Sequence, residues 1–320
     1  MSEIVAVEPA PSPVPVGAPE PLSAEDHGAL RRAVAALERP SLAGRLSAMA
    51  GGPLDLITRA LPAPVVEAVG HATETAMRGA LHVALATLPK TAEASVDQGA
   101  LVPLGPDLSP SWRTKAMELL ERFPPGDRGH KALAAVSGAI GGAFGITTLA
   151  VELPISTTLM LRSIAEIAQR EGEDLADPEA ALACMQVFAL GGRGPTQGEG
   201  GAGSAAESGY FAVRGALAKA MSEAARYAAG RGLVDESAPA LLRFAGQVGA
   251  RFGGVVSQKL AAQAVPVLGA LGGAAVNTAF MDHFQAVARG HFTVRRLERR
   301  YGKALVREAY EAERASLATA

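Results

Sequence analysis

Two uncharged, glycine-rich stretches dominate this sequence. The first spans residues 132–151 and reads ALAAVSGAIGGAFGITTLAV, and the second spans residues 260–281 and reads LAAQAVPVLGALGGAAVNTAFM. Glycines four residues apart recur in both, namely Gly138 and Gly142 in the first stretch and Gly269 and Gly273 in the second. On a helix this spacing leaves one face without side chains, so that a second backbone can approach closely. We therefore predict that these glycines are close-packing positions between helices.

The length of the two stretches allows two interpretations. About 20 residues of helix match the roughly 30 Å hydrocarbon thickness of a bilayer, so either stretch is long enough to enter a membrane. Alanine and glycine favour insertion only weakly, however, and both stretches contain polar residues such as Thr147 and Asn277. The balance favours a compact multi-helix bundle built around two glycine-rich apolar helical hairpins.

Composition supports an all-α fold. Aromatic residues make up only 4% of the 320 positions, whereas β-sheets favour aromatic and β-branched residues. The formal net charge of −2 gives the chain no polyanion-binding character, so we predict no nucleic-acid partner. The single cysteine, Cys184, excludes an internal disulfide.

The chain divides into a tail and one helical domain. Residues 1–22 are rich in proline and predict a disordered tail, and residues 23–320 predict a single helical domain with a flexible glycine-rich loop at 191–209. The tail has no secretory signal, so the default expectation is a cytoplasmic protein. Within the domain, the patterns predict helices over residues 24–38, 64–88, 112–123, 155–170, 178–190, 210–229, 239–252 and 282–313.

A similar hexapeptide occurs in both glycine-rich stretches. The sequence GAIGGA at 138–143 returns as GALGGA at 269–274. Either this is a chance similarity in a chain rich in alanine and glycine, or the two hairpins are equivalent halves of an internal pseudo-repeat.

Charged residues that border the uncharged stretches are candidate functional positions. Glu152 and Asp282 each follow one stretch, and burying either without a partner would cost several kcal/mol. Arg162 and Arg289 are the natural partners for structural salt bridges. The alternative is that one of these carboxylates is a working acid or proton site.

A second candidate is the acidic cluster at 171–174. It includes Glu173 and Asp174 and joins two predicted helices, where acidic side chains often cap the following helix. A cation site or a contact surface is the alternative.

The C-terminal helix is basic and amphipathic. Arg295, Arg296, Arg299 and Arg300 lie beside an apolar face that contains Val294 and Leu297. Such a helix is typical of an element that lies on an anionic membrane surface. The alternative places the apolar face in the core and the arginines in solvent.

Established catalytic signatures are absent from the sequence. A G-x-G-x-x-G match at Gly198, Gly200 and Gly203 follows no predicted strand, so it does not indicate a dinucleotide site. Asp282, His283 and His291 could approach one another on a helix, but histidines on such helices are more often ordinary polar residues. We predict no metal and no cofactor.

Several short motifs together carry a resemblance to a known family. They are Glu152-Leu153-Pro154, Thr157-Thr158, Leu161-Arg162-Ser163-Ile164-Ala165, Ile167-Ala168, Glu171-Gly172-Glu173-Asp174, Val187-Phe188-Ala189-Leu190-Gly191, Gly272-Gly273-Ala274, Asn277, Phe280, Phe292, Arg296-Leu297-Glu298 and Tyr301-Gly302. In these residues the chain resembles the EcsC family over roughly residues 110–305. The resemblance implies a helical bacterial protein with a link to membranes or transport, and it brings no catalytic residues.

These observations favour a non-enzymatic protein that is membrane-associated or accessory to transport. Its expected partner is an anionic membrane surface or a membrane protein, and its expected location is the cytoplasm, peripheral to or partly inserted in the inner membrane. A hydrolase that uses the Glu152/Asp282 region and a cytosolic interaction scaffold are the alternatives. The sequence does not specify an oligomeric state.

Overall fold

The structure is a computed structural model that describes residues 21–38, 62–86, 149–192, 209–231, 238–263 and 269–319. Every regular element in these ranges is an α-helix, which confirms the prediction of an all-α fold. The helices are α1 (Ala24–Leu37), α4 (Ala63–Ala86), α7 (Leu149–Arg170), α8 (Pro178–Gly191), α9 (Gly209–Arg231), α10 (Pro239–Gln263), α11 (Gly269–Tyr301) and α12 (Lys303–Thr319).

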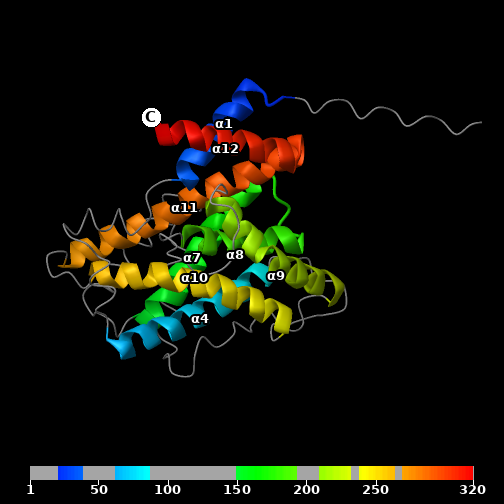
Figure 1. Ribbon diagram of the computed structural model, residues 1–320. Coiled ribbons are helices and arrows are strands. Elements are labelled where there is room, and N and C mark those ends of the chain that lie inside the picture. The colour runs from blue at the N-terminus through cyan, green and yellow to red at the C-terminus, as the bar shows by residue number, and fades with distance from the viewer. Residues whose placement is uncertain are drawn as a thin grey trace, which may run out of the picture.

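Helix α8 forms the centre of the bundle. The side chain of Asp177 accepts a hydrogen bond from the Glu179 amide, which caps the helix at its predicted start. All residues from Ala180 to Gly191 are buried, since α4, α7, α9, α10 and α11 all pack against this helix (Figure 1). A helix that is apolar on every side belongs in the interior, and α8 fits that rule.

Four phenylalanines join α8 to its neighbours. Phe188 on α8, Phe252 on α10, and Phe280 and Phe284 on α11 are in mutual contact, with ring centroids 5.0 to 6.0 Å apart. A Cβ atom at Gly191 would overlap the ring of Phe284, so this position needs a glycine. Although the chain has few aromatic residues, four of them therefore meet where α8, α10 and α11 pack together.

The predicted single helix over residues 282–313 is wrong, because the chain breaks into α11 and α12 at Gly302. This glycine has φ of 89°, a left-handed conformation that ends a helix. Helix α12 then folds back onto α1, where Tyr310 Oη donates to Glu38 Oε1 at 2.7 Å. Figure 1 shows α1 and α12 together at one end of the bundle, above the C-terminal half of α11.

The hairpins and the pseudo-repeat are not confirmed. Gly138 and Gly142 lie outside the described residues, as do the predicted helix at 112–123, the tail at 1–20 and residues 193–208 of the predicted loop. The second uncharged stretch falls across the end of α10 and the start of α11. Gly269 and Gly273 belong to the first two turns of α11, but the structure does not describe what surrounds them.

Candidate functional site

The last two turns of α11 carry an ion-pair cluster. Arg295 forms a bidentate pair with Glu173, with Nε 2.8 Å from Oε1 and Nη2 3.1 Å from Oε2. The two side chains are only 14% and 4% exposed. Arg299 also pairs with Glu173 and donates to the carbonyl oxygen of Glu171 at 2.8 Å. Burial alone would raise the pKa of Glu173, but Arg295 and Arg299 outweigh this effect and hold that pKa below its ordinary value.

The turn between α7 and α8 brings these acids to α11. Gly172 has φ of 78°, and the amide of Glu173 bonds back to the carbonyl of Ala168 at 3.0 Å. This is the glycine-dependent way in which a helix ends. It places Glu171 and Glu173 on either side of the reversal, both facing arginines of α11.

The same arginines also hold α1. Arg296 Nη1 lies 3.0 Å from Asp26 Oδ1, and Arg300 Nη1 lies 2.9 Å from Asp26 Oδ2. Tyr301 Oη donates to Asp26 Oδ2 at 2.8 Å. The hydrogen bond from Tyr301, followed by those from Arg296 and Ser23, holds the pKa of Asp26 below its ordinary value in spite of burial.

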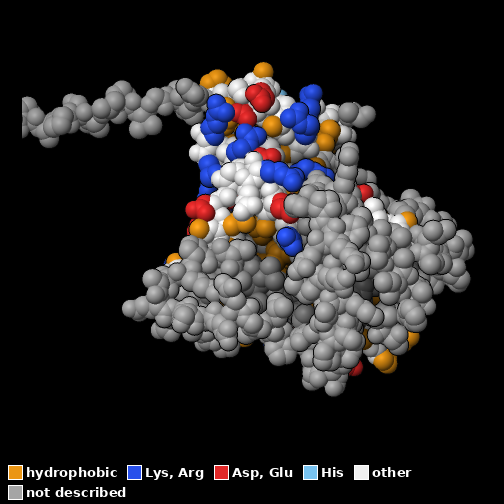
Figure 2. All heavy atoms as spheres, turned by 180° about the vertical axis from the view of Figure 1, so that it is seen from behind, with side chains coloured by type: hydrophobic (Ala, Val, Ile, Leu, Met, Phe, Trp, Pro, Cys, Tyr) orange, Lys and Arg blue, Asp and Glu red, His pale blue; other side chains and the backbone are white. Residues whose placement is uncertain are grey.

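These pairs give the four arginines of the predicted membrane-facing set partners within the protein. Arg295, Arg296, Arg299 and Arg300 pair with four carboxylates, Asp26, Glu171, Glu173 and Glu179, and we call this set the arginine cluster. The apolar face of the helix points inward, since Val294 and Leu297 are completely buried. Figure 2 shows Lys and Arg side chains gathered on the upper part of the molecule with Asp and Glu side chains among them. The alternative that places the apolar face in the core therefore describes this helix.

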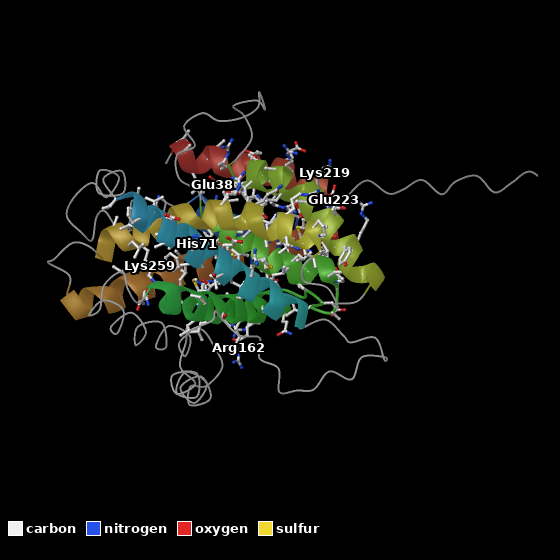
Figure 3. The ribbon with its side chains drawn as sticks, turned by 90° about the horizontal axis from the view of Figure 1, so that it is seen from below. Glu38, His71, Arg162, Lys219, Glu223 and Lys259 are labelled. Atoms are coloured by element: carbon white, nitrogen blue, oxygen red, sulfur yellow. The ribbon has the colours of Figure 1, made fainter. Side chains whose placement is uncertain are left out.

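The other predicted charges are Asp174, Arg162, Arg289, Asp282 and Glu152. Asp174 accepts a hydrogen bond from the Ala176 amide at 2.9 Å and so shapes the turn before α8. Arg162 is exposed and points away from the bundle (Figure 3), and Arg289 is also exposed. Asp282 is partly exposed, so neither it nor these arginines is a deeply buried charge. Glu152 lies in α7, but the structure does not describe its side chain.

A buried tyrosine–histidine pair was not foreseen from the sequence. Tyr210 Oη lies 2.9 Å from His291 Nδ1, and both side chains are completely buried. Arg214 donates to the same hydroxyl at 3.3 Å and forms a bidentate pair with Glu298 at 2.7 and 2.9 Å. The Tyr210 hydroxyl accepts from Arg214 and also forms a hydrogen bond with His291 Nδ1, whose direction depends on the imidazole tautomer. The Nε2 atom of His291 has no hydrogen-bond partner.

The histidines do not form a metal site. His283 Nε2 lies 2.9 Å from the carbonyl oxygen of Gly191, whereas His291 contacts Tyr210. No group of three or more His, Cys, Asp or Glu side chains in the described part of the chain is arranged to hold a metal ion.

A groove lies between α4 and α10. It has a volume of about 510 Å³ and is lined by α4 from Val66 to Arg78 and by α10 from Leu242 to Ser257. The two helices run antiparallel and side by side (Figures 1 and 3). Their register places Gly249 opposite Met77 and Gly253 opposite Thr73, since a Cβ atom at each glycine would meet that side chain. We call this feature the α4–α10 groove.

Small residues line this groove, and they differ in what lies opposite them. Gly246, Gly249 and Gly253 are three and four residues apart on α10, and Gly70 faces the groove from α4. A Cβ atom at Gly70 or at Gly246 would meet no described atom within 4 Å. These two glycines therefore do not serve close contact between α4 and α10, and no described side chain fills the space above them.

One polar atom in the groove has no partner. Thr73 is 2% exposed, and its Oγ1 makes no hydrogen bond in the structure. The Thr73 hydroxyl and methyl groups both lie 3.8 Å from the position of a Cβ atom at Gly253, so the side chain faces α10 across the groove. A buried hydroxyl without a partner costs roughly 1–3 kcal/mol, so this position favours a ligand that can satisfy it.

The hydrophobicity of the helices and the comparisons with known proteins complete the description. Within the described ranges, no helix combines the length and apolar character needed to cross a membrane. Neither the curated proteins nor the solved structures contain a match to this chain. The model of the EcsC protein family matches residues 28–297, from the first turns of α1 to the last turns of α11. The chain belongs to the EcsC protein family.

Proposed function

We propose that this protein is a non-enzymatic, membrane-associated accessory protein that acts by binding an apolar ligand in the α4–α10 groove. The observation that carries the proposal is the open space above Gly70 and Gly246, beside the unpartnered hydroxyl of Thr73. Ligand sites are typically concave and mainly apolar, with a few polar groups that orient the ligand. The groove has this character, with Val69, Met77 and polar Thr73 among its lining residues.

The charged groups support binding rather than chemistry. Tyr210 and His291 are residue types that act in acid–base catalysis, but both are completely buried, so a substrate cannot reach them in this conformation. The arginine cluster is occupied by its own carboxylates, so it adds little attraction toward anionic lipid. Membrane association through the groove would therefore depend on apolar contact more than on charge.

The test is co-sedimentation of the purified protein with vesicles of phosphatidylethanolamine and phosphatidylglycerol. We expect the protein to sediment with the vesicles and to remain bound when salt is raised, because salt screens charges but does not weaken apolar contacts. Gly246→Leu fills the groove and is expected to release the protein. Gly215→Leu is the matched control, since Gly215 is an exposed glycine of α9 that also meets no described atom. Equal sedimentation of both variants would refute a role for the groove.

A further inference from the structure

An exposed stripe of small residues runs along α10. Gly246, Ala250 and Gly254 follow one another at intervals of four residues, and all three are exposed. A Cβ atom at Gly246 or at Gly254 would meet no described atom within 4 Å. Residues four apart lie on one face of a helix, and small residues on such a face let a second helix approach closely. Ala250 is the centre of this stripe.

Two exposed charges of opposite sign lie on α4 at the rim of the groove. Glu74 and Arg78 are one helical turn apart and pair at 2.7 Å, and their side chains are 59% and 63% exposed. Both are therefore accessible to a charged partner while they also contact each other. Ala76 is the centre of this pair.

The two centres lie at the same level of the groove. In an antiparallel pair of helices, one step forward along α4 corresponds to one step back along α10. Because Gly249 lies opposite Met77, Ala250 lies opposite Ala76. The second close contact between the two helices, four residues away on each, gives the same register. One axis can therefore pass through the middle of the small stripe and the middle of the charged pair.

A two-fold axis at this level would pair the surface with itself. It reverses the direction of each helix, so that Gly246 of one copy would meet Gly254 of the other, and Glu74 would meet Arg78. Each carboxylate would then lie between two guanidinium groups, and each guanidinium group between two carboxylates. A parallel arrangement would instead place Glu74 against Glu74 and Arg78 against Arg78, and like charges repel. The charges therefore favour the antiparallel arrangement.

The unpartnered hydroxyl of Thr73 supports the same arrangement. Thr73 is 2% exposed, lines the groove next to Glu74, and has no hydrogen-bond partner at Oγ1. Arginine carries five N–H donors, more than one carboxylate uses. Arg78 of the second copy would lie level with Glu74, where it can also donate to Thr73 Oγ1. A second copy can thus satisfy an oxygen that is left without a partner in a single chain.

We infer that two copies of this chain form an isologous dimer through the α4–α10 groove, with Glu74 of each copy paired with Arg78 of the other. The dimer goes beyond the proposed function, because it rests on the charges and the helix register rather than on the apolar character of the groove. It also regulates that function, since a second copy covers the groove and competes with a membrane for the same surface. This competition rests on the proposed function, whereas the dimer itself does not.

The test is sedimentation velocity of the full chain over a range of concentrations without lipid. We expect a reversible equilibrium between monomer and dimer. Glu74→Arg and Arg78→Glu each create two like-charge contacts across the axis, so each should weaken dimerisation at least about tenfold. Both changes in one chain restore opposite charges and should restore the dimer. Glu308→Arg, at an exposed position of α12, changes the net charge as Glu74→Arg does and should leave the dimer Kd unchanged within about a factor of two.

A mixture of the two single variants separates contacts between copies from the pair within α4. One variant then presents two acids and the other two arginines, so the mixture should form a heterodimer although each variant alone is monomeric. A change that acts only within one helix would not respond to mixing. Absence of the heterodimer, a chain that is monomeric at every concentration, or a dimer that neither single change weakens would each overturn the inference.

Failure of this inference can be distinguished from failure of the proposed function. If the chain stays monomeric but Gly246→Leu still abolishes vesicle sedimentation, the dimer is refuted and the proposed function stands. If the double charge exchange restores the dimer but Gly246→Leu leaves vesicle sedimentation unchanged, the dimer stands and the proposed function is refuted. Where both hold, the two monomeric variants should sediment with vesicles more completely than the unmodified protein at raised salt, because their groove is uncovered. Weaker sedimentation of both variants would refute the competition.

Discussion

The arginine cluster and the α4–α10 groove differ in whether their side chains have partners. At the end of α11, Glu173 and Asp26 each hold two arginines, and Arg295 and Arg296 each contact two carboxylates. Between α4 and α10, two glycines meet no described atom and a hydroxyl has no partner. The charged side chains of the cluster are paired with one another, whereas the described part of the chain leaves space unfilled in the groove. Substitutions in the arginine cluster should lower the free energy of unfolding, whereas substitutions in the groove can raise it by a smaller amount.

The largest effect is expected from Glu173→Gln. This change removes the charge that pairs with buried Arg295 and with Arg299, and breaking a buried ion pair typically costs about 3–5 kcal/mol. Glutamine keeps one acceptor oxygen, so we expect a loss of about 3 kcal/mol in the free energy of unfolding, measured by urea denaturation. The control is Glu223→Gln on α9 (Figure 3), whose partner Arg243 is 57% exposed, so that this pair should be worth less than about 1 kcal/mol. Equal losses in both variants would contradict a special role for the arginine cluster.

The sequence predicted the local features of this cluster but not its partners. Ser23 and Asp26 predict the start of α1, and Ser23 Oγ does accept the Asp26 amide at 3.1 Å. Asp26 also pairs with Arg296, 270 residues away, and nothing in local spacing connects those two positions. The apolar spacing of Val294 and Leu297 likewise predicts an amphipathic helix without stating what covers its apolar face. Local chemistry sets helix ends and faces, whereas distant partners depend on how the whole bundle packs.

The groove and the buried histidine were missed for a related reason. Gly246, Gly249 and Gly253 have the spacing of one helix face, a signal that was present in the sequence. Glycine spacing alone does not show whether a neighbouring backbone fills the space, as happens at Gly290, or leaves it open. His291 was visible only as a polar residue of an amphipathic helix, because its partner Tyr210 is 81 residues away.

Substituting alanine for glycine should have opposite effects in the two regions. At Gly290, where α1 crosses α11, a Cβ atom would lie 2.7 Å from Leu37 Cγ and 3.1 Å from the Ala33 carbonyl oxygen. Overpacking of this kind typically costs about 1–3 kcal/mol, so Gly290→Ala should lower the melting temperature. Gly246→Ala in the groove meets nothing and should add about 0.5–1 kcal/mol of stability through helix propensity. Calorimetric melting of both variants tests the contrast, and a gain at Gly290 would show that α1 and α11 are less tightly packed than described.

The buried histidine predicts a pH dependence that the exposed groove does not share. Burial, followed by the charges of Arg214 and Arg295, holds the pKa of His291 well below the ordinary value of 6.5. The unfolded chain therefore takes up a proton below about pH 6.5 that the folded protein does not. The free energy of unfolding should fall as the pH drops below that value, by up to about 1.4 kcal/mol per pH unit.

Urea denaturation at pH 7.0 and 5.5 measures this dependence. His291→Gln removes the group, so the decrease between the two pH values should be about 1 kcal/mol smaller than in the unmodified protein. If the decrease in unfolding free energy between the two pH values were the same in His291→Gln, other titratable groups would be its cause. Asp26 and Glu173 act in a separate window, because their lowered pKa values contribute stability that is lost only as the pH falls below their ordinary values of 3.8 and 4.5.

The smallest expected change in the free energy of unfolding comes from Thr73→Val, which should also affect ligand binding. Thr73→Val replaces the unpartnered hydroxyl with a methyl group of similar size, so the ligand-free protein should gain up to about 1 kcal/mol in unfolding free energy. The same change removes a donor that the groove offers to a bound ligand, so co-sedimentation with vesicles should weaken. Thr157→Val is the matched control, because Thr157 Oγ1 is also buried without a partner but does not line the groove. It should raise stability and leave vesicle co-sedimentation unchanged. If Thr73→Val raised both stability and affinity, the hydroxyl would be a cost to the groove rather than part of its recognition of a ligand.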